Sequence, residues 1–208
     1  MKSKLIKVLL LTLPLILAIA SIGVGRFEVD FIVQMKILLS QIIPIDQTWT
    51  NVEETVVMNV RLPRIILAML IGGGLAIAGA AFQGMFANPL VSPDILGVSA
   101  GAGFGASIGI LFFGTGFTMQ IFALVMGMIA IGFTFMIGGV RRDMPMFMLV
   151  LAGVVTSALF QAFISLVKFM ADPEEKLPSI TYWLMGSLGT ASYRDLWVGG
   201  PLILVGII

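Results

Sequence analysis

The sequence has no cysteine and no histidine among its 208 residues, and only 11 % of its residues are charged. In this chain the missing cysteines exclude disulfides and thiolate chemistry, and the missing histidines exclude imidazole proton relays and histidine metal ligands. No phosphate-binding glycine loop is present, and no hydrophobic run holds a pair of carboxylates. The net charge of +1 and the lack of basic runs longer than two residues do not indicate a nucleic-acid partner. We therefore expect no enzymatic site, no cofactor and no metal site.

Apolar residues, in contrast, make up 59 % of the chain, and the mean hydropathy is +1.09. Soluble domains carry about 25 % charged residues, so a soluble fold of this composition would leave much apolar surface uncovered. In lipid the backbone must satisfy its own hydrogen bonds, as helices or closed barrels do. Apolar runs of about 20 residues favour helices, because barrel strands alternate over about 10. The predicted fold class is all-α, a polytopic membrane protein with about six transmembrane helices in a single domain over residues 1–208.

The predicted spans cover residues 5–25, 57–86, 94–113, 117–137 and 146–169, with a sixth that begins near Leu196. The first run is alternatively a secretory signal, because Ala18-Ile19-Ala20 resembles a cleavage site; its extension beyond that site favours a retained span. About 13 apolar residues follow Leu196, fewer than the roughly 20 of a span. We therefore expect the natural chain to be longer than this one.

Other segments are expected to lie at the membrane surface or to break helices. Residues 31–43 are too few to span and predict an interfacial helix or a re-entrant turn. Residues 180–188 predict a short aromatic helix at the interface. Pro63 is expected in the first turn of its helix, where no internal N–H partner is needed. The basic N-terminus predicts that both chain ends and the Arg141–Arg142 loop are cytoplasmic.

Small residues recur every fourth position on two of the predicted spans. Four residues return to nearly the same face of a helix, so each span presents a groove with almost no side chains. In lipid, such grooves allow two helices to pack closely. The first set is Ala68, Gly72, Ala76, Ala80 and Gly84, and the second is Gly97, Gly101, Gly105 and Gly109. Between them, the prolines of residues 88–93 break the helix.

Two arginines, Arg61 and Arg64, stand three apart at a predicted helix start and are expected on one face of it. The helix dipole disfavours cations at a helix N-terminus. Two arginines at this position therefore suggest an external partner. One interpretation is contact with lipid phosphates. The other is docking of a partner carboxylate, which guanidinium groups bind in bidentate fashion.

A few polar residues fall within or at the ends of the predicted spans. Gln83, Thr156, Gln161 and Ser165 either form hydrogen bonds between helices or line a passage. Asn88 lies at the corner and has the same two interpretations. Lys168 is expected to extend toward the membrane surface, and Asp94 to stabilise a helix N-terminus.

Taken in order, these motifs resemble the permease subunits of bacterial ABC importers for iron–siderophores, haem and vitamin B12, the FecCD-type permeases. The resemblance covers residues 58–188. It rests on RLPR at 61–64, GAAFQ at 79–83, NPL at 88–90, Pro93, LGVSAGA from residue 96, LAGV at 151–154 and YWLMGS at 182–187.

The resemblance implies a permease of about ten spans in a bacterial or archaeal cytoplasmic membrane. It further implies pairing with a second permease subunit, two ATPase subunits, and a substrate-binding protein that docks on Arg61 and Arg64. Asn88, Pro89 and Leu90 would form part of a cytoplasmic gate, and 146–169 would line the passage. A second gate would fall at residues 144–147, where Met-Pro-Met-Phe departs from the small hydroxyl residues common in the family.

Two other functions are weighed against an ATP-driven permease. A secondary transporter driven by protons or sodium places ionisable residues at mid-membrane, and none of the spans from 57 to 169 has a charge that must lie there. A packing subunit without a passage would explain the glycine grooves. It would need neither the polar corner nor the paired arginines.

Overall fold

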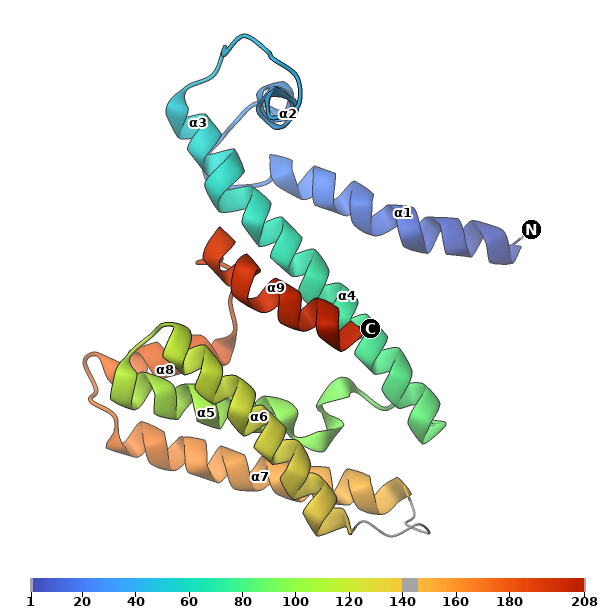
Figure 1. Ribbon diagram of the computed structural model, residues 1–208, viewed down its shortest axis with the longest axis vertical. Helices are drawn as coiled ribbons and strands as arrows, with labels where there is room; N and C mark the ends of the chain where they lie inside the picture. Colours follow the sequence, from blue (N-terminus) through green and yellow to red (C-terminus); the bar gives the residue numbers. More distant parts are fainter. Residues whose placement is uncertain (1, 140–145, 208) are drawn as a thin grey trace. The chain divides into compact units, whose positions relative to one another are not determined.

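The computed structural model describes residues 2–139 and 146–207, and all regular structure within them is helical. Figure 1 shows the helices in chain order. They are α1 (Lys2–Gly23), α2 (Phe31–Ser40), α3 (Asn51–Thr55), the π-helix η1 (Val56–Arg61), α4 (Leu62–Phe86), the 3₁₀-helix η2 (Pro93–Leu96), α5 (Val98–Phe113), α6 (Phe117–Gly138), α7 (Met146–Met170), α8 (Lys176–Met185) and α9 (Tyr193–Ile207). The predicted all-α class is confirmed.

Three helical stretches are long and apolar enough to cross a membrane. They are Asn51–Phe86, Phe117–Gly138 and Phe147–Met170. Shorter apolar helices at Val8–Gly23, Phe31–Ser40 and Val98–Phe113 coincide with other apolar segments found in the sequence. The chain is thus a polytopic membrane protein with spans where the longest hydrophobic runs predict them.

The helices form two compact units, residues 1–77 with 188–208, and residues 78–187. The first unit has a small core of buried apolar side chains from α1, α2, η1 and the loops between them: Ile22, Val29, Ile37, Trp49 and Val57. Asp30 begins α2 by accepting a 2.7 Å hydrogen bond from the Ile32 N–H. Thr50 and Glu53 form a reciprocal capping box that begins α3, which satisfies two otherwise unpaired N–H groups.

The helix containing Pro63 begins much earlier than the sequence predicts. α3, η1 and α4 run on from one another from Asn51 to Phe86, so the expected position of Pro63 in a first turn is wrong. The π-helical turn lies immediately before the proline, and the Leu62 N–H bonds the Val57 carbonyl five residues back. Proline has no N–H to donate to the helical hydrogen-bond pattern. The wider π-helical turn lies next to this missing hydrogen bond.

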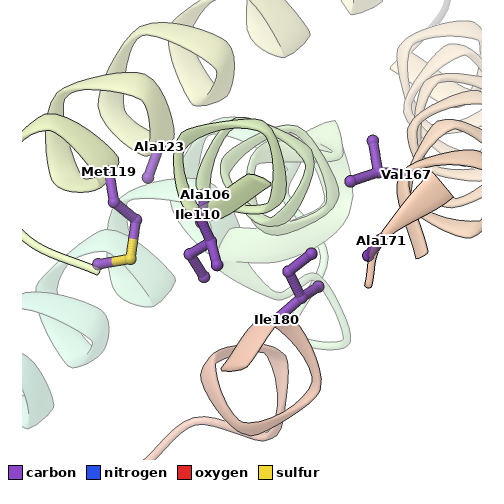
Figure 2. Close-up of a cluster of buried hydrophobic side chains, with 7 residues drawn as sticks. All are labelled: Ala106, Ile110, Met119, Ala123, Val167, Ala171 and Ile180. Atoms are coloured by element: carbon purple, nitrogen blue, oxygen red, sulfur yellow. The ribbon is translucent and has the colours of Figure 1, made fainter. Parts of the chain in front are cut away.

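The second unit is built around α5, which packs against α6, α7 and α8 (Figure 1). Figure 2 shows its main core, where small and branched side chains from these helices meet around α5. The core residues are Ala106, Ile110, Met119, Ala123, Val167, Ala171 and Ile180. Within this unit the glycine face of α5 lies directly against α6. A Cβ at Gly105 would lie 2.1 Å from the Phe122 carbonyl oxygen, and one at Gly109 would lie 2.7 Å from the Met119 Cα.

Two helix starts in this unit differ from the prediction. α5 begins at Val98 rather than at Asp94, because η2 and the left-handed Gly97 (φ 76°) intervene. α8 begins at Lys176 rather than at residue 180, because Pro178 falls in its first turn, where proline is tolerated. α8 ends at Gly186, whose φ is 72°.

Candidate transport groove and its surrounding residues

The second unit contains a pocket of about 400 Å³ that runs along α7 beside the start of α5. Its lining is mixed, with charged, hydroxyl, amide and apolar groups. The lining residues are Asp94, Ser99, Ala100, Ser157, Gln161, Ile164, Ser165, Lys168 and Leu184. Four of these, Ser157, Gln161, Ser165 and Lys168, recur at spacings of four, four and three, which places them on one face of α7. We call this pocket the α7 groove.

The wall opposite α7 is set by close backbone contacts. A Cβ at Gly153 would lie 1.9 Å from the Ile95 carbonyl oxygen, and one at Gly97 would lie 3.0 Å from the Ser157 Oγ. Both glycines therefore bring the η2–α5 junction against α7. Asp94 stabilises this junction, since its Oδ1 accepts a 3.2 Å hydrogen bond from the Ser99 N–H in the first turn of α5.

Two of the four residues predicted to line a passage, Gln161 and Ser165, are on the α7 groove. The Ser165 hydroxyl donates to the Gln161 backbone carbonyl at 3.0 Å. Thr156 instead is fully buried between helices, where the Thr134 hydroxyl lies 3.0 Å from it and donates to the Leu96 carbonyl at 2.8 Å. Gln83 is exposed on α4 and is not among the residues of the groove.

The corner at Asn88, Pro89 and Leu90 is a tight, exposed turn. The Asn88 N–H bonds the Gln83 carbonyl at 3.1 Å, and the Asn88 side-chain oxygen accepts from the Leu90 N–H at 3.0 Å. The Leu90 side chain is 89 % exposed. An exposed apolar side chain on an ordered turn is suited to contact with another surface. The cytoplasmic gate assigned to this corner stays a prediction.

Arg61 lies inside the first unit. Its side chain is only 6 % exposed, and its guanidinium donates to the Ile22 carbonyl and to the Phe27 carbonyl, each at 2.5 Å. Ile22 is in the last turn of α1, where carbonyls have no partner within the helix. Gly25 gives the guanidinium room, because a Cβ there would lie 2.5 Å from the Arg61 Nη2.

Arg64 has a different partner from Arg61, and their position on one face of the helix stays a prediction. Its Nη2 donates to the Gly189 carbonyl, and its Nε is buried without a hydrogen-bond partner among the described residues. Docking of a partner on these arginines remains a prediction, and the burial of Arg61 leaves Arg64 as its better candidate.

The remaining predicted sites are the small residues of α4 and α5 and the predicted second gate. On α4, a Cβ at Gly72 or Gly84 would meet no described atom within 4 Å, and Ala76 and Ala80 are exposed. On α5, a Cβ at Gly101 would lie 2.4 Å from the Ala130 Cβ. Of the predicted second gate at 144–147, residues 144 and 145 lie outside the described residues, while Phe147 is exposed at the start of α7.

The family model of the FecCD transport family matches residues 11–208 of this chain. The chain belongs to the FecCD transport family. The molybdate import system permease protein MolB of Haemophilus influenzae is 37 % identical over 187 residues, which are 89 % of this chain and 55 % of that protein. The Fe(3+)-citrate import system permease protein YfmE of Bacillus subtilis is 31 % identical over 208 residues, 98 % of this chain and 59 % of that protein.

A solved structure of an inward-facing metal-chelate type ABC transporter has the same fold. Its TM-score to this chain is 0.76 at 35 % identity, with 96 % of this chain and 59 % of that chain covered. The FecCD chain thus spans about half the length of the relatives it matches. The family assignment agrees with the resemblance found from the sequence motifs.

Proposed function

We propose that this chain is part of a permease subunit of an ATP-binding-cassette importer that moves metal chelates into the cell across a bacterial or archaeal cytoplasmic membrane. The observation that carries the proposal is the α7 groove, a polar channel wall within an apolar helical unit of a FecCD protein. Its cargo is a chelate of the iron–siderophore, haem or cobalamin type. Similar proteins import molybdate, Fe(3+)-citrate or vitamin B12.

In this proposal the chain is a transport component, and ATP hydrolysis belongs to separate ATPase subunits. The exposed turn at Asn88–Leu90 forms part of the inner gate, which opens and closes as the ATPases change state. A substrate-binding protein outside the membrane docks near Arg64, whose side chain is partly exposed and can pair with a carboxylate. A second permease subunit supplies the facing wall of the passage, and membrane lipid surrounds the remaining apolar surface.

The test is uptake by the complete importer in proteoliposomes, with full-length permease, ATPase subunits and binding protein. We expect uptake of a metal-containing probe only when ATP is inside with the ATPase subunits and the binding protein is on the opposite side. A nonhydrolysable ATP analogue is the matched control and should give none. Ionophores that collapse proton and sodium gradients should leave the uptake rate unchanged.

Uptake that follows an ion gradient and needs no ATP would contradict the proposal and favour a secondary transporter. The described parts of α5 and α6 contain no charged residue, and α7 contains only Lys168. A gradient-coupled carrier usually keeps ionisable groups at the centre of its spans. The described helices therefore do not favour this second function.

A further inference from the structure

Lys168 is the one cation in the described parts of α5, α6 and α7, and it lies on the α7 groove. Lys168 lies in the last turn of α7, where a lysine can reach the interface, and its place on the groove lining is what points to a function. In the described residues an ion pair joins Lys176 to Glu175, at 3.5 Å, and none is found at Lys168. The Lys168 ammonium therefore has no carboxylate partner in the part of the chain that the structure describes.

The acid best placed to pair with Lys168 is Asp172, four residues further along the chain. Its carboxylate is used elsewhere. The Asp172 Oδ2 accepts hydrogen bonds from the Glu174 N–H at 3.2 Å and the Glu175 N–H at 2.8 Å. The turn after α7 thus holds the Asp172 carboxylate in place with its charge intact, and no ion pair between Asp172 and Lys168 is found among the described residues.

The only acid on the groove, Asp94, lies at the opposite end from Lys168. Asp94 is held at the start of α5 by its bond to the Ser99 N–H, and that start contacts α7 at Ser157. Ser157 and Lys168 are separated by roughly 16 Å at 1.5 Å per residue. Asp94 and Lys168 line the groove from η2 and from α7, and no ion pair between them is found among the described residues. The groove has a positive end and a negative end.

We infer that Lys168 makes the groove selective for an oxygen-rich metal anion, either a metal oxyanion or a negatively charged metal chelate. The inference rests on the proposed function and names the class of its cargo. The ammonium contacts anionic oxygens at one end of the groove, and the Gln161 amide and the Ser157 hydroxyl offer hydrogen bonds along it. The charge at Asp94 repels the anion, so the favourable contacts of the anion lie at the Lys168 end of the groove.

The first test measures uptake by the complete importer of three probes: molybdate, ferric citrate and cyanocobalamin, which is neutral overall. We expect uptake of an anionic probe.

The variant K168Q should lower its maximal uptake rate about tenfold, as removal of one close charge in a partly solvated site does. The apparent KM, set by the binding protein, and the basal ATP hydrolysis should not change. K168R should restore the rate, and K176Q, outside the groove, is the matched control.

The comparison of uptake with basal ATP hydrolysis separates a cargo contact from a structural role. A lysine that only holds the fold would lower both activities together when replaced. Equal loss of uptake and ATP hydrolysis in K168Q, or unchanged uptake, would overturn the inference. Which of molybdate and ferric citrate is taken up distinguishes an oxyanion from an anionic chelate. Uptake of cyanocobalamin alone would overturn the inference and leave the proposed function standing.

A second test needs no knowledge of the cargo. Because this chain has no cysteine, S165C places a single thiol one helical turn from Lys168, in a transporter whose other subunits and segments are also free of cysteine. We expect the anionic sulfonatoethyl methanethiosulfonate to react faster than its trimethylammonium counterpart. Adding K168Q should lower the ratio of the two rates about tenfold. An unchanged ratio would overturn the inference, even if no probe were transported and the proposed function itself had failed.

Discussion

Replacement of Arg61 by glutamine should destabilise the first unit and leave the surface of the protein largely unaltered. The guanidinium donates to two backbone carbonyls, those of Ile22 and Phe27, from a position that is almost completely buried. R61Q removes both hydrogen bonds and also removes the positive charge at the end of α1. The two carbonyls are left without partners in an apolar surrounding.

The expected loss follows from three contributions. Each hydrogen bond from a charged donor contributes about 1.5–3 kcal/mol, and a cation at a helix C-terminus adds up to about 2 kcal/mol. The cost of desolvating the buried guanidinium, several kcal/mol, opposes these gains. We expect a net loss of about 3 kcal/mol, within the usual range for breaking a buried charged contact. For a protein of this size that corresponds to a decrease in Tm of about 6–12 °C.

Thermal unfolding of the complete transporter in detergent measures this effect. R26Q is the matched control, because Arg26 is an exposed arginine in the same loop, and its Tm should stay within about 1 °C of the wild type. G25A should also lower Tm, since its Cβ would displace the Arg61 guanidinium. The effects of G25A and R61Q should not add, because both remove one contact. An unchanged Tm in R61Q, with weaker affinity for a binding protein, would refute the burial argument and restore docking as the role of Arg61.

Three further predictions test other parts of the structure. R64E should weaken binding-protein affinity about tenfold or more, measured by titration with the labelled binding protein, because a reversed charge repels the expected carboxylate. G105A should cost about 1–3 kcal/mol in thermal melts, because the new methyl group overlaps a backbone carbonyl of α6; the matched variant G72A, with open space around it, should be neutral or stabilising. T134V should cost about 1 kcal/mol by removing the donor to the Leu96 carbonyl, and equal stability would show that water or another group replaces it.

Hydrophobic length and motif order carried most of what could be predicted from the sequence. The longest apolar runs became α4, α6 and α7, because a backbone that must satisfy its own hydrogen bonds in lipid has few alternatives to a helix. The order of short motifs pointed to the FecCD family. The capping box at Thr50 and Glu53 also marks the start of the continuous helical stretch Asn51–Phe86. Its T-x-x-E spacing can be recognised in the sequence.

The direction of the arginines could not be predicted, for a physical reason. Placing Arg61 and Arg64 on one face assumes a regular α-helical step of 3.6 residues per turn. Their hydrogen-bond partners in the structure are different, because Arg61 donates toward the end of α1 and Arg64 donates to the Gly189 carbonyl. The partners of Arg61 are carbonyls more than thirty residues earlier in the chain, at Ile22 and Phe27. Every residue has a backbone carbonyl, so no sequence pattern predicts which carbonyls accept hydrogen bonds from Arg61.

The groove was predicted only in part. Gln161 and Ser165 were expected to line a passage. Ser157 and Lys168 lie on the same face of the helix but were not included in that prediction. Their spacing along α7 was a usable signal. Thr156 next to Ser157 has the same polar character, yet it points away into the contact with Thr134. Adjacent positions on a helix face directions about 100° apart, so polarity alone does not decide which of two neighbours meets the passage.

The arrangement of the second unit also connects the corner that we propose as an inner gate with the groove that we propose for the cargo. The short η2 helix (Pro93–Leu96) links the corner at 88–90 to the groove. Its Asp94 lines the groove, and its Leu96 carbonyl accepts the bond from Thr134 on α6. Gly153 on α7 lies so close to the Ile95 carbonyl that this junction has no free space to move within. A packed junction with few alternatives transmits displacement rather than absorbing it. In the proposed function, a shift of the corner would move η2 against α7, and the wall of the groove with it.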